Sequence, residues 1–107
     1  MESEVQINSG ISAQSFDTIV KAFKDFSEIE SAVLFGSRAL GTFKKGSDID
    51  IAIYGQNLTS QTALSISSQL NENAPIPYFV DIVAPKFVDS PSIIEHIERV
   101  GISIYNI

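Results

Sequence analysis

Residues 33–54 read VLFGSRALGTFKKGSDIDIAIY, and this stretch decides the fold. The pattern predicts an apolar strand over 31–35, a small-residue turn at Gly36 and Ser37 followed by a short basic loop, and a second strand over 47–54. Four of the chain's six glycines lie in or just after the stretch: Gly36, Gly41, Gly46 and Gly55. Because glycine permits positive φ, the backbone here is expected to approach a ligand closely.

Helices and strands are also predicted on both sides of this stretch. Ser12 can cap a first helix, whose apolar residues recur at helical spacing, and Thr59 can cap a second. The pattern favours a third strand over 78–83, a last helix from Ser90-Pro91 to Gly101, and a short strand over 102–105. The polar residues 1–10 are expected to form a frayed end or a short edge segment.

The order of these elements predicts the fold class. Helix, strand, strand, helix, strand, helix is typical of an α/β chain of the mixed α+β kind, with a small mixed sheet against which the helices pack. At 107 residues the chain has the common size of one domain, so residues 1–107 are expected to form a single domain.

Composition argues against several classes of function. No apolar run is long enough to span a membrane, and the polar start lacks the basic flank of a signal peptide, so a cytoplasmic protein is expected. The chain has no cysteine, so a metal would be held by oxygen ligands or by the single histidine. A net charge of −6 argues against direct nucleic-acid binding, which needs a basic face.

Basic residues are concentrated in the segment 31–47, which contains no acid. They are Arg38, Lys44 and Lys45. Solvated loops often carry such a trio, but its position beside Gly36 and Ser37 favours a phosphate site. His96 lies beside the apolar stripe of the last helix and is expected to be a surface residue.

Asp48 and Asp50 are unusual in an apolar strand, because an unpaired buried acid costs free energy. Two residues apart on one face, their Cα atoms are ~7 Å apart, so the side chains can converge on a common ion. Carboxylate oxygens favour Mg²⁺ or Mn²⁺, and Asp81 on the third strand could add a third ligand. The alternative is a half-exposed strand with two acids on its solvated face. The upstream Gly36-Ser37 pair and the matching Asp81 favour the metal site.

The ordered combination of Gly36-Ser37, the segment SDID at 47–50 and an acid on a later strand resembles the nucleotidyltransferase superfamily. The fuller string GSRALG…SDIDIAI is similar to the minimal nucleotidyltransferases, small prokaryotic proteins often paired with a helical HEPN partner in toxin–antitoxin systems. The resemblance covers roughly residues 12–105 and implies the small nucleotidyltransferase fold. One departure is Leu40, where many relatives have Arg or Lys.

The resemblance implies a role for each matching residue. The Gly36-Ser37 turn would hold the triphosphate, the aspartate pair would bind two Mg²⁺ ions (or Mn²⁺), and the third acid would bind the ion that activates the attacking hydroxyl. The implied nucleotide-binding residues are Gly36, Ser37, Arg38, Ser47 and Lys45. The implied catalytic and metal-binding residues are Asp48, Asp50 and Asp81, with Asp89 the next candidate for the third acid.

By this resemblance the expected function is metal-dependent transfer of AMP from ATP to a hydroxyl on a partner protein. The expected partner is a HEPN-type toxin, for which the chain would be the antitoxin in a hetero-oligomer. Two alternatives stay open. One is a binding module that neutralises its partner by masking, with weak or no catalysis. The other is an enzyme that modifies a small molecule, which the shortage of residues for an acceptor domain disfavours.

Overall fold

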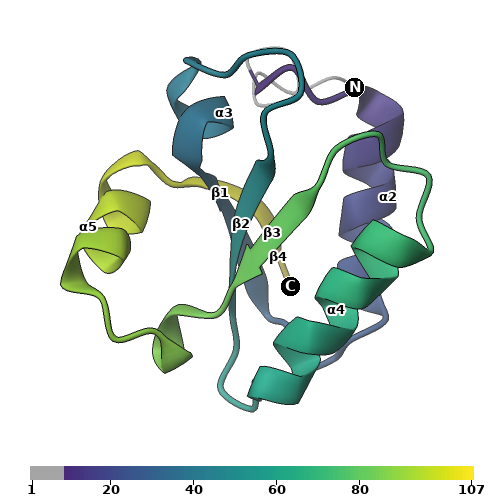
Figure 1. The fold of residues 1–107 in the computed structure, drawn as a ribbon. Coiled ribbons are helices and arrows are strands. Elements are labelled where there is room, and N and C mark those ends of the chain that lie inside the picture. The colour runs from purple at the N-terminus through teal and green to yellow at the C-terminus, as the bar shows by residue number, and fades with distance from the viewer. Residues whose placement is uncertain (1–8) are drawn as a thin grey trace.

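A four-stranded mixed sheet lies at the centre of the structure, a computed structural model that describes residues 9–107 (Figure 1). Its order is β3-β2-β1-β4, with β1 antiparallel to both β2 and β4 and with β2 parallel to β3. The strands are β1 Ser31–Phe35, β2 Ile49–Tyr54, β3 Val80–Val83 and β4 Ile102–Asn106. The predicted mixed sheet is therefore confirmed. Of the polar segment 1–10, residues 1–8 lie outside the described part of the chain.

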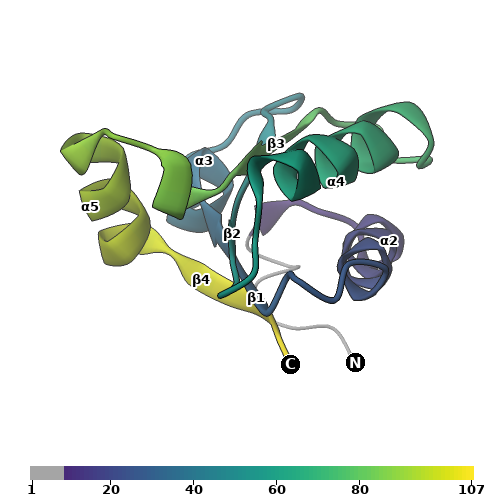
Figure 2. The same cartoon turned by 90° about the horizontal axis from the view of Figure 1, so that it is seen from below.

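Helices cover both faces of the sheet, α2 and α4 on one side and α5 on the other (Figure 2). The helical segments are α2 Ala13–Lys24, α3 Gly36–Leu40, α4 Ser60–Glu72, the 3-10 helix η1 Pro85–Phe87 and α5 Pro91–Val100. The hydroxyl of Ser12 accepts a hydrogen bond from the backbone N–H of Ser15, and that of Thr59 accepts one from Thr62, so both predicted caps are confirmed. Within residues 9–107, no helix is long and apolar enough to cross a membrane.

The two faces of the sheet differ in composition because successive strand residues point to opposite sides. Ile49, Ile51 and Ile53 of β2 are fully buried in the main core, which α2 and α4 complete. Ala52 points to the other face and packs in a smaller cluster with Phe35 and with Ile97 of α5. Asp50 alternates with the buried isoleucines and shares the face of Ala52.

The strand β3 lies at the edge of the sheet, and a side chain of α4 holds its outer backbone. The amide nitrogen of Asn71 donates to the carbonyl of Val80 at 2.8 Å, and its oxygen accepts from the N–H of Val80 at the same distance. An edge strand otherwise leaves such groups without a ladder partner. Asn71 therefore fixes the residue directly before Asp81.

Two local predictions were wrong. Residues 36–40 form a short helix where a turn and loop were expected: Gly36 starts it at φ 75°, and Gly41 ends it in the left-handed conformation. The second strand starts at Ile49 rather than at residue 47, because Ser47 belongs to a turn. Its N–H donates to the carbonyl of Lys44, and its hydroxyl accepts from the N–H of Lys44.

Candidate active site

Three predicted site residues meet on the face of the sheet that carries α5. Phe35, the last residue of β1, pairs with Asp50, so Gly36 follows directly beside that carboxylate. Asp50 pairs in turn with Asp81 across the parallel ladder of β2 and β3. Paired residues on neighbouring strands share a face and lie about 4.8 Å apart. The strand register places Asp50 beside Asp81, and the start of α3 places Gly36 against Asp50, so these three residues form a row across three elements.

Gly36 has no room for a side chain. Its φ of 75° lies in the region that favours glycine, and a Cβ built there would collide with the Oδ2 atom of Asp50. The peptide backbone at the start of α3 thus lies directly against the carboxylate. The sequence predicted a close approach of backbone to ligand at this glycine, and the structure adds a close approach to Asp50.

The electrostatics of the site centre on Asp50. Partial burial and, to a smaller extent, the negative charges of Asp81 and Asp48 together raise the pKa of its carboxyl from the ordinary 3.8 to about 6. The positive charges of His96 and Arg38 act in the opposite direction. The strand thus carries an acid whose charged form is unfavourable unless a cation neutralises it.

The chemistry of these acids fits a divalent ion. Carboxylate oxygens are the ligands that Mg²⁺ and Mn²⁺ prefer, and a bound cation would relieve the repulsion that acts on Asp50. In residues 9–107, however, no three Asp, Glu, His or Cys side chains lie close enough together to hold an ion as they stand. Asp48 and Asp81 are both exposed, so their side chains would have to turn toward Asp50 to complete a site.

The predicted nucleotide-binding residues divide into two groups. Lys45 is exposed and Ser37 is partly exposed, so both can be reached from solvent. Arg38 is only 2% exposed, and its guanidinium donates to the backbone carbonyl of Ser47. The hydroxyl of Ser47 closes the turn with Lys44. The phosphate-binding roles of all four stay predictions, and the contacts of Arg38 and Ser47 are within the protein.

His96 belongs to this site, although the sequence analysis expected a surface residue. It is partly buried, its ring lies edge-on to Phe35 with centroids 6.1 Å apart, and its charge lowers the pKa of Asp50. The helical spacing contained the signal, because His96 lies four residues before Val100, which packs in the cluster between α5 and the sheet.

Comparison with known proteins assigns the family. A family model described as polymerase beta, nucleotidyltransferase, matches residues 17–107. The chain belongs to this nucleotidyltransferase family. No curated protein sequence matches the chain.

Solved structures share the fold of this nucleotidyltransferase chain. One belongs to a toxin–antitoxin complex with AMP-PNP, with a TM-score of 0.71 and 23% identity over 86% of this chain and 73% of that chain. Another belongs to the toxin–antitoxin MntA-HepT, with a TM-score of 0.65 and 20% identity over 88% and 72%. A third belongs to tri-AMPylated Shewanella oneidensis HEPN toxin in complex with MNT antitoxin, with a TM-score of 0.65 and 20% identity over 88% and 71%. At these identities the likeness concerns the fold.

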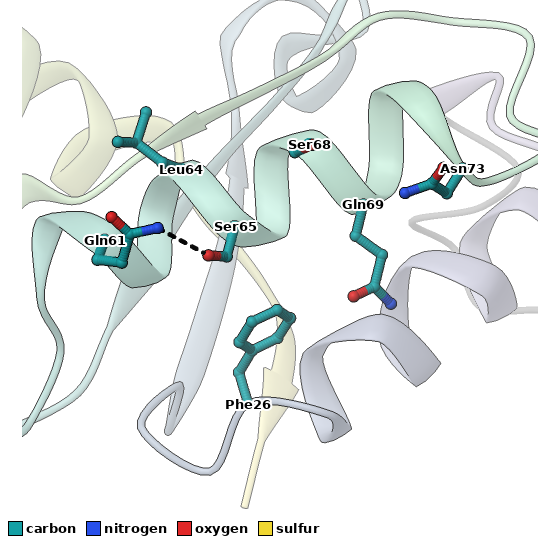
Figure 3. A pocket seen from close by; sticks show the side chains of 7 residues that line it. All are labelled: Phe26, Gln61, Leu64, Ser65, Ser68, Gln69 and Asn73. Atoms are coloured by element: carbon teal, nitrogen blue, oxygen red, sulfur yellow. Dashed lines mark hydrogen bonds between the residues drawn. The ribbon is translucent and has the colours of Figure 1, made fainter.

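An open groove of about 780 Å³ lies away from the nucleotidyltransferase carboxylates, along α4 beside the end of α2 (Figure 3). Figure 3 shows Phe26 pointing into it, with Gln61 and Ser65 hydrogen-bonded to each other along the helix. Its lining contains no ionisable side chain. Because α4 covers the opposite face of the sheet from Asp50, this groove lies apart from the predicted site.

Proposed function

We propose that this chain transfers AMP from ATP to a hydroxyl group of a partner protein and acts as the antitoxin of a HEPN-type toxin. The observation that carries the proposal is the row of Gly36, Asp50 and Asp81 in a nucleotidyltransferase fold. We further propose that residues 1–107 act as one catalytic domain, with the acceptor supplied by the partner in a hetero-oligomer.

In the proposed reaction an acceptor oxygen forms a bond to the α-phosphorus of ATP, the bond to the bridging oxygen breaks, and pyrophosphate leaves. The backbone of Gly36 and the hydroxyl of the partly exposed Ser37 would approach the triphosphate beside Asp50. Lys45, on the loop between α3 and β2, can supply positive charge to the same phosphates. The acceptor hydroxyl would approach from the side of Asp81.

Asp48, Asp50 and Asp81 are the residues that would hold divalent ions, and the resemblance to the family supports this assignment. Bound ions would stabilise the attacking and leaving oxygens and offset the charge of the triphosphate. The chain's own part is to hold Asp50 and Asp81 on two neighbouring strands, with Asp48 directly before the first of them. The raised pKa of Asp50 supports the same conclusion, because an acid that is costly to ionise alone gains most from a cation.

The relatives of similar fold support the choice of partner. They come from complexes of a toxin with an antitoxin, one of them containing a tri-AMPylated HEPN toxin. In this chain residues 9–107 are used for the sheet and its helices. We propose that a partner chain supplies the surface that presents the acceptor.

Calorimetric titration with ATP tests the metal-dependent site. We expect ATP to bind in the presence of Mg²⁺ and to bind at least about 10-fold more weakly with chelator, because three unscreened carboxylates repel the phosphates. Titration with Mg²⁺ and inorganic tripolyphosphate would show whether the triphosphate alone carries the affinity. Equal affinity for ATP with and without the metal would contradict the proposed site.

A further inference from the structure

Arg38 is the largest side chain that the structure buries completely, and no acid among residues 9–107 forms an ion pair with it. Only 2% of the residue is exposed. The ion pairs found within residues 9–107 are Lys21–Asp17 and Arg99–Glu95, both at the surface. Burying a charge is costly unless hydrogen bonds and polarizable groups compensate for the lost water. The hydrogen bonds and ring contacts of the guanidinium must therefore offset this cost.

Those contacts join four separate segments of the chain. Nε and Nη2 donate to the carbonyl of Ser47 at 3.1 and 2.9 Å, and Nη1 donates to the carbonyl of Ser9 at 2.7 Å. The ring centroids of Phe43 and Tyr78 lie 4.9 and 4.4 Å from the guanidinium carbon. Arg38 thus links the segment before α2, the helix α3, the loop before β2 and the residues before β3.

We propose that Arg38 is a positioning residue that fixes the loop 41–48 and, through it, the orientation of Asp48 and Asp50. The inference rests on the proposed function for the purpose of those two acids, and it gives Arg38 a different role from the phosphate contact that the sequence pattern predicted.

The peptide bond after Ser47 transmits the effect. Its carbonyl accepts both the Nε and Nη2 hydrogen bonds, and a peptide bond is planar from one Cα atom to the next. Holding this carbonyl therefore fixes the plane that ends at the Cα atom of Asp48, immediately before β2 begins. The fork geometry of a guanidinium suits such a two-bond contact, which the single amine of lysine cannot reproduce.

The same cluster also touches the strand of the third acid. Tyr78, whose ring lies over the guanidinium, precedes Asp81 by three residues. On the other side Gly10, at φ 73°, brings the backbone so close that a Cβ would collide with the ring of Phe43 and lie 3.0 Å from Nη1. One buried cation thus holds the approaches to both strands that carry the acids.

Hydrogen exchange of Arg38→Lys tests the proposal without any ligand. We expect amide exchange in residues 41–48 to accelerate at least about 10-fold, since hydrogen bonds to a charged group are lost from that segment. Exchange in α4 should stay unchanged. Arg99→Lys is the matched control, because Arg99 is exposed on α5 and pairs only with Glu95. Unchanged exchange in 41–48 would overturn the positioning role.

Calorimetry with ATP separates positioning from direct phosphate contact. A positioning residue should lower the Mg²⁺-dependent ATP affinity about 10- to 100-fold and leave the weak affinity in chelator unaltered. A direct phosphate ligand would lower the affinity in both conditions with no change in loop exchange, and that result would overturn the proposal. If wild-type protein bound no ATP even with Mg²⁺, the proposed function would fail, while the exchange measurement would still decide the role of Arg38.

A second variant covers the case in which Arg38→Lys does not fold. Phe43→Leu removes one ring from the guanidinium and leaves all three hydrogen bonds in place. Exchange in residues 41–48 should increase relative to the wild-type protein, while exchange in α4 stays unchanged. No increase in this variant would contradict the proposed cluster.

Discussion

The backbone of Gly36 lies against the carboxylate of Asp50 in a conformation that L side chains rarely adopt. Gly36→Ala should therefore lower the free energy of unfolding for two reasons: alanine is strained at the left-handed φ, and its Cβ would collide with Oδ2 of Asp50. Gly46→Ala is a matched control, since Gly46 has a φ of 91° and nothing within 4 Å of its Cβ position. The φ strain common to both is about 1–2 kcal/mol. Urea unfolding should show a clearly larger loss for Gly36→Ala, and equal losses would mean that the carboxylate simply moves away.

Asp50 should make stability depend on pH. Its pKa in the folded state is about 6, above the ordinary 3.8, so the folded state binds the proton more tightly than the unfolded state does. The free energy of unfolding should then fall as pH rises from about 4 to 6, with the full penalty present above pH 6. Asp50→Asn lacks this penalty, so in chelator it should melt at a higher temperature than wild type at pH 7–8.

The difference between Asp50→Asn and wild type should disappear as the pH falls below about 3.8, where the native acid becomes protonated in the folded and the unfolded state alike. Asp17→Asn, on the exposed surface of α2, provides the control for a general loss of negative charge. A lower melting temperature of Asp50→Asn at pH 7–8 would indicate that the ionised carboxylate has a structural role instead.

At the scale of elements, the sequence could predict what local patterns encode. A continuous apolar run identified β1, and the alternation of isoleucines with other residues identified β2. The caps at Ser12 and Thr59 could be predicted because a hydroxyl three residues before an amide satisfies it locally. The helix α3 was missed because a Gly-Ser pair favours turns, whereas the residues that follow it are good helix formers. The burial of Arg38 could not be predicted, since it depends on contacts with segments up to 40 residues away.

The edge strand β3 depends on a single side chain of α4. Asn71→Ala would leave both the N–H and the carbonyl of Val80 without these partners, at a cost of about 1–3 kcal/mol. Amide exchange in 80–83 should accelerate more than in β1, because the loss is confined to the edge. Asn73→Ala is the control, since Asn73 is an exposed residue just after α4. Equal effects of the two variants would show that the Asn71 contacts contribute little.

At the scale of the whole molecule, the sheet separates stability from chemistry. The face under α2 and α4 contains the main apolar core, and the face under α5 carries the acids and only a small cluster. Substitutions among the exposed acids should therefore leave the fold intact and change function alone. Because such a variant should keep its fold, its catalysis and its binding to the partner can be measured separately.

Asp81→Asn tests whether the proposed enzyme neutralises its partner by transfer or by masking. Asp81 is exposed on the edge strand, while Asp50 lies one strand further in, beside Gly36. The variant should therefore keep most of its Mg²⁺-ATP affinity in calorimetry and lose transfer of AMP to the HEPN-type partner. A loss confined to the transition state lowers the rate with little change in nucleotide binding. If the complex still forms but the toxin is no longer neutralised, transfer is the mechanism, whereas full neutralisation would assign the effect to masking.

Asp89→Asn, in the exposed loop before α5, is the matched control. Full transfer by Asp81→Asn together with loss in Asp89→Asn would move the third acid to Asp89.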